Sequence, residues 1–290
     1  MCLSSARRER RCDRCGSSRL DPFRYCVVCG NRTVPTCFRS ELALSRVGGV
    51  TDVGRHKRHN QDAIAIGTGP ASAIAIVCDG ISQSTFGELA ALHASETGVE
   101  QLLFGLASGK SNDAASNLAA ASAATAAARI GRGITTTPPG CTYASIVVDH
   151  ETITVSSIGD SRVYWISGDH AECLTVDDTK AGYLAASGVP FDDDRYRDPD
   201  TNALLRWLGA DAPPVDAPTT VHRPDREGFV VVCSDGLSGY TDRPRDLLPM
   251  PSGPPVAQAS ALVGRALRQG GRDNVSVAVA PFPQPTRRAS

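Results

Sequence analysis

Six short runs of valine, isoleucine and small apolar residues recur between residues 71 and 282, and each ends in or is followed by Gly, Asp or Pro. β-Branched residues favour extended backbone, and the residues that close each run favour turns. Each run therefore predicts one β-strand, and together they predict a fold built on β-sheets. The runs are ASAIAIVCDG, TYASIVVD, TITVSSIGD, RVYWIS, GFVVVCSDG and NVSVAVAPF.

Three other segments follow a helical pattern. Apolar residues within 87–109 mostly fit one helical face, and the Ala-rich segment 113–131 follows directly, so that small side chains permit the two helices to pack closely. Residues 255–271 begin with Pro and close with two Gly, as a helix often does. Residues 175–225 are polar and rich in Asp and Pro, which predicts loops with one short helix.

Composition narrows the class of protein. The chain has 290 residues, of which 41% are hydrophobic and 21% charged, which is typical of a globular protein with one large domain or two smaller ones. Lys and Arg number 30 against 31 Asp and Glu, so no excess charge favours nucleic acid or a membrane surface. No run approaches the ~18 apolar residues of a membrane span, and the basic start lacks the apolar part of a signal peptide. We therefore expect a cytoplasmic protein with no nucleic-acid or membrane partner.

Four of the ten cysteines form two copies of one short motif near the N-terminus. Cys12-x-x-Cys15 is followed by Gly16, and Cys26-x-x-Cys29 is followed by Gly30. A CxxC turn points two thiolates at one place. The spacing predicts a structural Zn²⁺ site with four thiolate ligands and no open position, while a redox-active or disulfide pairing is the alternative. So small a module needs its metal to fold. The domains expected are a zinc ribbon at 1–40 with a basic N-terminus, a second domain at 41–283, and a disordered tail at 284–290.

Three aspartates stand where predicted strands begin or end. Asp79 and Asp235 each follow a buried run and precede Gly, and Asp273 stands just before the last strand. One Asp-Gly is usually a turn, but a carboxylate at the mouth of an apolar strand is costly unless a cation neutralises it. The sequence offers no matching set of basic residues, and oxygen ligands suit Mg²⁺ or Mn²⁺. A carboxylate shared by two such ions suits hydrolysis of a phosphate ester.

Five motifs along residues 46 to 282 carry a family resemblance. In this order and spacing, the chain resembles bacterial members of the metal-dependent type 2C protein serine/threonine phosphatases. The resemblance implies an α+β fold, a four-layer α/β/β/α sandwich of two antiparallel sheets flanked by helices, here preceded by the zinc ribbon. It also implies phosphoserine and phosphothreonine proteins as substrates. The motifs are RHKRHNQD, VCDGISQS, SIGDSRVYWIS, VVCSDGLSGY and GGRDNVSVAV.

The resemblance assigns roles position by position. Asp79 matches the carboxylate that bridges two Mn²⁺ or Mg²⁺ ions, and the backbone carbonyl of Gly80 matches a ligand of one of them. Asp235 and Asp273 match the residues that complete the other ion's ligands. Asp62 matches an acidic residue that orients metal-bound water, and Asp160 resembles the ligand of a third, weaker ion. Water shared by two cations attacks phosphorus in line, so the reaction needs no cysteine nucleophile.

The phosphate contact is assigned by its spacing from Asp62. Five residues before Asp62, where the family has an arginine that grips two phosphate oxygens, this chain has Lys57. Lysine offers a point charge rather than a planar fork. Arg55 and Arg58 are alternatives for the role, and solvated surface charge is the simplest interpretation of all three.

Two departures from the family pattern bear on activity. Gln61 stands where members often have Glu, and Ile81 stands where eukaryotic members have a histidine that is a candidate general acid. Metal affinity is then expected to be lower, and protonation of the leaving group falls to metal-bound water. The alternative function is a weak or inactive phosphatase fold that serves as a signalling or docking module. The expected partners are phosphorylated proteins, with a Ser/Thr kinase or its substrates among them.

Overall fold

The structure is a computed structural model in which two six-stranded antiparallel sheets pack face to face. It describes the backbone of residues 2–5 and, with side chains, residues 12, 14, 15, 17–19, 21, 25–30, 38–134, 136–213 and 217–284. Apolar side chains from the inner faces of both sheets form one core layer between them, and each outer face forms a further core with its helices. Within the described residues, no helix is both long and apolar enough to cross a membrane.

The first sheet contains the strand that carries Asp79. Its order runs from β1 at one edge to β12 at the other, and every neighbouring pair is antiparallel. The central strands are buried on both faces, which explains why their sequences are continuous apolar runs. The strands in spatial order are β1 (Cys2–Ser5), β4 (Ala63–Thr68), β5 (Ala73–Cys78), β7 (Tyr143–Val148), β8 (Ile153–Ile158) and β12 (Thr219–His222).

The second sheet carries the strands next to Asp235 and Asp273. A tight turn joins two neighbouring strands of this sheet, Arg162–Ser167 and His170–Cys173. Gly168, with a φ of 59°, supplies the left-handed residue that this two-residue turn requires. The strands in spatial order are β10 (His170–Cys173), β9 (Arg162–Ser167), β13 (Gly228–Cys233), β14 (Val275–Phe282), β3 (Val47–Asp52) and β2 (Arg39–Leu44).

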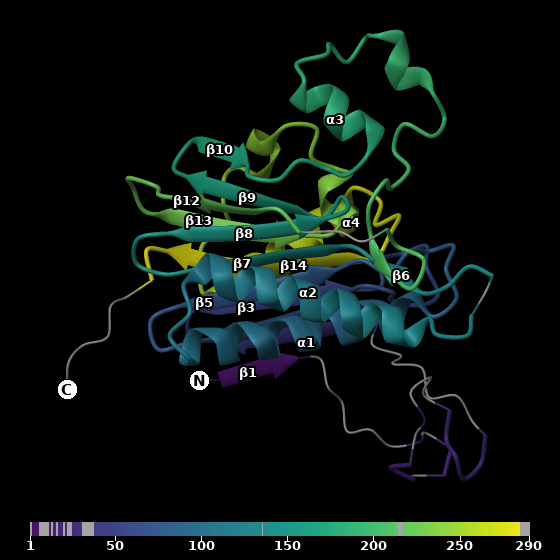
Figure 1. The fold of residues 1–290 in the computed structure, drawn as a ribbon. Coiled ribbons are helices and arrows are strands. Elements are labelled where there is room, and N and C mark those ends of the chain that lie inside the picture. The colour runs from purple at the N-terminus through teal and green to yellow at the C-terminus, as the bar shows by residue number, and fades with distance from the viewer. Residues whose placement is uncertain are drawn as a thin grey trace.

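Helices cover the outer face of each sheet, so the layers run helix, sheet, sheet, helix (Figure 1). The long helices α1 (Gly87–Ala107) and α2 (Asn112–Ile130) lie on the first sheet, and the alanines on their inner faces are fully buried. They are Ala90, Ala91, Ala94, Ala115, Ala119, Ala123 and Ala127. The short helix α4 (Asp235–Ser238) and α5 (Pro255–Arg268) lie on the second. This confirms the predicted four-layer sandwich.

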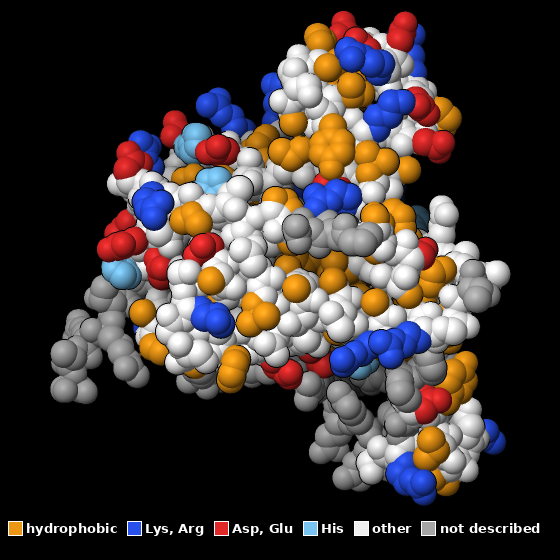
Figure 2. Space-filling model, viewed as in Figure 1, with side chains coloured by type: hydrophobic (Ala, Val, Ile, Leu, Met, Phe, Trp, Pro, Cys, Tyr) orange, Lys and Arg blue, Asp and Glu red, His pale blue; other side chains and the backbone are white. Residues whose placement is uncertain are grey.

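A separate segment between β10 and β12 projects from the sandwich (Figure 1). It contains α3 (Lys180–Ala186) and the 3₁₀ turn η1 (Asp194–Arg197), and Figure 2 shows charged side chains of both signs gathered on it. The small sheet of β6 (Gly140–Cys141) and β11 (Leu208–Gly209) lies at its base, and the 3₁₀ turn η2 (Pro244–Leu247) follows α4 along the chain.

The six predicted strands and three predicted helices are confirmed, and α3 is the one short α-helix among the described residues of the polar region 175–225. The sequence did not predict β12, which lies in that region, nor β10 and the strands β2, β3 and β4 between residues 39 and 68. At the N-terminus, β1 pairs with β4, so residues 2–5 belong to the first sheet and not to a ribbon spanning 1–40. The division into domains otherwise stays a prediction, and all but the first residue of the tail predicted at 284–290 lies outside the described residues.

Candidate metal and phosphate site

Asp79 stands at the end of β5, where the strand leaves the sandwich. Its backbone is fixed on both sides by Thr142: the Asp79 N–H donates to Thr142 Oγ1 at 2.9 Å, and the Thr142 N–H donates to the Asp79 carbonyl at 2.8 Å. Thr142 Oγ1 is in turn 2.7 Å from Ser161 Oγ. Burial, followed by repulsion from Asp62 and Asp235, raises the pKa of Asp79 well above its ordinary value.

Asp62 is brought beside Asp79 by strand pairing. Ala63 of β4 pairs with Cys78 of β5, so the residues just before and just after that pair meet at one end of the sheet. Ser234 Oγ donates to Asp62 Oδ2 at 2.7 Å, but the buried Asp62 Oδ1 has no hydrogen-bond partner among the described residues. Burial and, after it, the charge of Asp235 raise the pKa of Asp62 to about 7.

Asp235 begins α4 and reaches the same end of the sandwich from the second sheet. Its pKa is raised by burial and by Asp273, and Asp79 lies close enough to share a hydrogen bond with it. Asp235 Oδ1 is a second buried carboxylate oxygen without a partner within the part of the chain that the structure describes.

Asp160 joins the group from the turn after β8. Gly159 before it has a φ of 95°, a left-handed conformation that other residues rarely adopt. Burial, then repulsion from Asp235 and Asp177, raises the pKa of Asp160 to about 7. Asp160 therefore lies in the same negative field as the other aspartates.

The turn that holds Asp160 is also the anchor of the α3 segment. Arg162 binds both carboxylate oxygens of Asp177, with a shortest contact of 2.7 Å. Asp178 accepts the Gly159 N–H at 2.9 Å and the Arg206 guanidinium at 3.1 Å. These contacts fix the start of the segment next to Asp160.

Asp273 is the most exposed of the aspartates and, among the described residues, carries the one ion pair of the group. Lys57 Nζ lies 2.7 Å from Asp273 Oδ1 and 3.1 Å from Ser82 Oγ. The next residue, Asn274, fixes the loop that carries Lys57, because its side chain accepts from the Gln61 N–H at 2.8 Å and donates to the Val53 and His59 carbonyls.

Gly80 leaves no room for a side chain. A Cβ there would lie 2.6 Å from the Gly87 carbonyl carbon and 2.7 Å from the Gln61 carbonyl oxygen. The chain after Asp79 therefore passes tightly between the Asp62 loop and the start of α1, with its backbone as the only chemistry it can offer.

The five aspartates fit divalent cations. Buried carboxylates that repel one another and lack donors are costly unless they are protonated or bound to cations. Lys57 and Arg162 are cations whose charge acts on Asp235. Two cations near five aspartates leave an excess of negative charge at the site. Among the described residues, only the four cysteines bring three or more ligand atoms within 4.8 Å of one another. The carboxylates of the five aspartates therefore do not converge on one point. A spread set suits two or more ions that share a carboxylate.

Sequence reasoning placed the five aspartates at one site but missed the side chains that hold them. Ser234, Thr142 and Asn274 are such positioning residues. Two of the three had a signal, because Ser234 directly precedes Asp235 and Asn274 directly follows Asp273. Arg58 and Arg55, the two alternatives to Lys57, lie in different places. Arg58 lines a cavity with Lys57, whereas exposed Arg55 packs beside Gly271.

The four N-terminal cysteines converge as predicted. Cys12 Sγ is 3.5 Å from Cys29 Sγ, and Cys15 Sγ is 3.5 Å from Cys26 Sγ. All four sulfurs lie within 4.8 Å of one another, and none is in a disulfide. Four thiolates around one point are the donor set of a structural zinc site.

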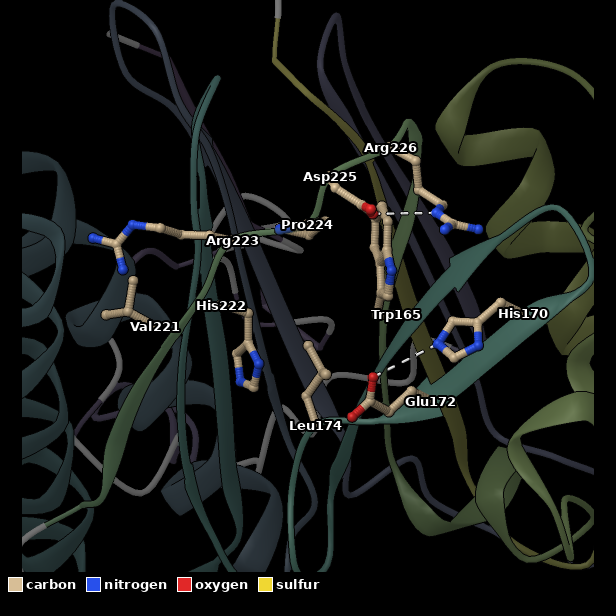
Figure 3. Close-up of a pocket in the computed structure, with 10 residues that line it drawn as sticks. All are labelled: Trp165, His170, Glu172, Leu174, Val221, His222, Arg223, Pro224, Asp225 and Arg226. Atoms are coloured by element: carbon tan, nitrogen blue, oxygen red, sulfur yellow. Dashed lines mark hydrogen bonds and ion pairs between the residues drawn. The ribbon is translucent and has the colours of Figure 1, made fainter.

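A cavity of about 510 Å³ lies away from the aspartates, between β10 and β12 at the open edge of the sandwich (Figure 3). Trp165 and Leu174 form its apolar floor. Its acidic side chains already have partners, since Asp225 pairs with Arg226 at 3.2 Å and Glu172 lies 3.7 Å from the imidazole of His170. The cavity therefore has no group of carboxylates that needs a metal.

Comparisons with known proteins agree with this geometry. The family model described as protein phosphatase 2C matches residues 53–253. The serine/threonine protein phosphatase PstP of Mycobacterium tuberculosis is 32% identical over 143 residues, 49% of this chain. Those residues are 27% of the relative, so the chain spans about a quarter of the length of the curated relatives it matches.

Solved structures share the fold over most of the chain. A bacterial serine phosphatase is 20% identical with a TM-score of 0.70, over 83% of this chain and 99% of that one. The M. tuberculosis phosphatase PstP/Ppp is 25% identical with a TM-score of 0.62, over 82% and 99%. The catalytic domain of PstP in complex with two manganese ions is 24% identical with a TM-score of 0.61, over 81% and 97%. With its fold, its aspartates and a family model that covers most of its length, the chain belongs to the protein phosphatase 2C family.

Proposed function

We propose that this chain is a metal-dependent protein serine/threonine phosphatase that hydrolyses phosphoserine and phosphothreonine. The observation that carries the proposal is the group of aspartates at one end of the sandwich, two of which have buried oxygens without partners. Family membership and the likeness to PstP support the same activity.

Each aspartate has a proposed place. Asp79, whose charge interacts with those of Asp62 and Asp235, would be the ligand that two Mn²⁺ or Mg²⁺ ions share, with the Gly80 carbonyl beside it. Asp235 and Asp273 would complete the second ion's ligands. Asp62 would orient water, and Asp160 would hold a third ion. The bound ions supply a water of lowered pKa and offset charge on the phosphoryl oxygens.

The chain's own contribution is to position these ligands before substrate arrives. Ser234 fixes one oxygen of Asp62, and the other has no hydrogen-bond donor among the described residues, so the carboxylate can accept a proton from water at Oδ1. Thr142 fixes the backbone of Asp79 from both sides. Asn274 holds the loop that carries Lys57 against the last strand. Preorganised groups of this kind need little rearrangement during the reaction.

Lys57 is the proposed phosphate contact. Its ammonium group already lies against Asp273, beside the proposed metal ligands, and its flexible side chain can turn towards a phosphate oxygen. Among the described residues, neither Arg58 nor Arg55 forms an ion pair with any of the five aspartates, whereas Lys57 does.

The metals follow from the donor atoms. Oxygen ligands favour Mn²⁺ or Mg²⁺ at the aspartates, and the PstP catalytic domain in complex with two manganese ions supports this choice. Cys12, Cys15, Cys26 and Cys29 are the proposed ligands of one structural Zn²⁺. The proposed setting is the cytoplasm, with phosphorylated proteins, including a Ser/Thr kinase or its substrates, as partners.

The test is turnover of p-nitrophenyl phosphate and of phosphothreonine peptides with Mn²⁺, with Mg²⁺ and in excess chelator. We expect activity with either metal, none in chelator, and a loss of at least a hundredfold in Asp79→Asn. Isothermal titration with Mn²⁺ should show tight binding to the parent and weakened binding to the variant. A chain that binds Mn²⁺ and phosphopeptide but releases no phosphate would support the alternative docking function instead.

A further inference from the structure

We propose that the cavity between the Lys57 loop and the start of α1 receives an acidic side chain of the substrate, next to the phosphorylated residue. The inference rests on the proposed phosphatase function and adds a preference among its substrates. The cavity measures about 320 Å³, and its lining residues are Lys57, Arg58, His59, Gln61, Ser82, Thr85, Phe86 and Glu88.

The position of the cavity ties it to the reaction site. Lys57 lines the cavity while its Nζ contacts Asp273 Oδ1 at 2.7 Å, so the cavity begins one side chain away from the aspartates. Gln61 also lines it and directly precedes Asp62. A peptide whose phosphate reaches the aspartates can therefore lay a neighbouring residue over or into this cavity.

The charge of the lining favours an anion. Lys57 and Arg58 are cationic, against one carboxylate, Glu88. Lys57 is engaged by Asp273 and Ser82, which leaves Arg58 as the available cation. Arg58 is exposed, and within the described part of the chain it forms no ion pair.

The cavity wall is built by an unusual backbone. Phe86 has a φ of 63°, the left-handed region that is uncommon for a bulky residue, and its carbonyl accepts from the Leu89 and Ala90 N–H groups as α1 begins. Such strain persists where surrounding structure holds it and gathers at ligand sites. The half-buried ring provides an apolar wall for the methylene groups of Asp or Glu, whose carboxylate then meets Arg58.

The experiment measures the ratio of kcat/KM for peptides that carry Glu to kcat/KM for peptides that carry Ala at the same position. Peptides with one phosphothreonine carry Glu, Ala or Lys at each of three positions on either side of it. For the parent with Mn²⁺, we expect kcat/KM at one position to be about threefold to fivefold higher with Glu than with Ala, the size of an exposed ion pair. Arg58→Ala should bring the ratio to one, Arg58→Lys should keep most of it, and Arg58→Glu should reverse it in favour of Lys.

A matched control and a second readout separate this inference from the proposed function. Arg46 bonds the Pro70 carbonyl at the opposite end of the sandwich, so Arg46→Ala should keep the parent's ratio. Fluorescence anisotropy of the labelled peptides with Asp79→Asn should show the same order of affinities without turnover. An Arg58→Ala enzyme that keeps the ratio, or equal Kd values for the Glu and Ala peptides, overturns the inference. An inactive parent with the affinity order intact would refute the phosphatase function and still support the acidic-residue cavity.

Discussion

Ser234 Oγ lies 2.7 Å from Asp62 Oδ2 and joins the turn after β13 in one sheet to the loop before β4 in the other. The same hydroxyl also accepts the Ser276 N–H at 3.0 Å, so it is fixed by a third strand. The contact holds the two sheets together at the end of the sandwich where the aspartates meet.

Ser234→Ala should destabilise the chain. The change removes the Ser234 donor from the buried Asp62 carboxylate, and such a loss costs about 1–3 kcal/mol. We expect a lower urea midpoint in the absence of metal and a smaller loss with saturating Mn²⁺, because the ion offsets the same carboxylate. Ser45→Ala, on the exposed turn between β2 and β3, is the matched control. An unchanged urea midpoint in Ser234→Ala would contradict the role assigned to this hydroxyl.

Asp79→Asn should have opposite effects on stability with and without metal. Removing one of several repelling buried carboxylates should keep or raise the Tm of the metal-free chain. In the parent, saturating Mn²⁺ should raise the free energy of unfolding by about 3 kcal/mol at a hundredfold excess over Kd. The variant should lose most of that gain. Thermal scans in chelator and in Mn²⁺ measure both effects, and an equal Mn²⁺ shift in the two proteins would exclude Asp79 as a ligand.

Lys57→Ala should raise KM for a phosphothreonine peptide about tenfold, because an ammonium contact to phosphate is lost. Lys57→Arg should keep or improve KM, since a guanidinium can bind two phosphate oxygens. Steady-state kinetics at several Mn²⁺ concentrations separate this effect from weaker metal binding through Asp273. If Lys57→Ala leaves KM and kcat as in the parent, another residue contacts the phosphate.

The purified chain should contain one zinc per molecule, held by the four ribbon cysteines. Changing Cys12 and Cys15 together to Ser should remove it, while Cys173→Ser should not, because Cys173 lies in β10 away from the cluster. Elemental analysis after dialysis gives the stoichiometry. Absence of zinc from the parent would leave the redox interpretation of the cysteines.

The strands and the aspartates were predictable because both have local causes. A strand buried on both faces, such as β5, must be a continuous apolar run, and the Asp that ends it stands out in the sequence. β12 lacked this signal, since it is an edge strand whose side chains are half exposed. The pairing of β1 with β4, the contact of Lys57 with Asp273 and the cavity beside Phe86 depend on residues far apart in the chain, so local patterns could not reveal them.

The pairing of β1 changes how the cysteine cluster is connected to the rest of the chain. The segment from residue 6 to residue 38 is fixed at both ends, by β1 in the first sheet and by β2 in the second. The two strand pairings already close this segment into a loop. A metal that links Cys12 to Cys29 closes a smaller loop within it, so closing that smaller loop costs less entropy than it would in a free tail. Removing the first 41 residues would also remove an edge strand and leave the hydrogen-bonding groups of β4 uncovered. Deletions at this end therefore test protection against strand-to-strand aggregation as much as they test the cysteines.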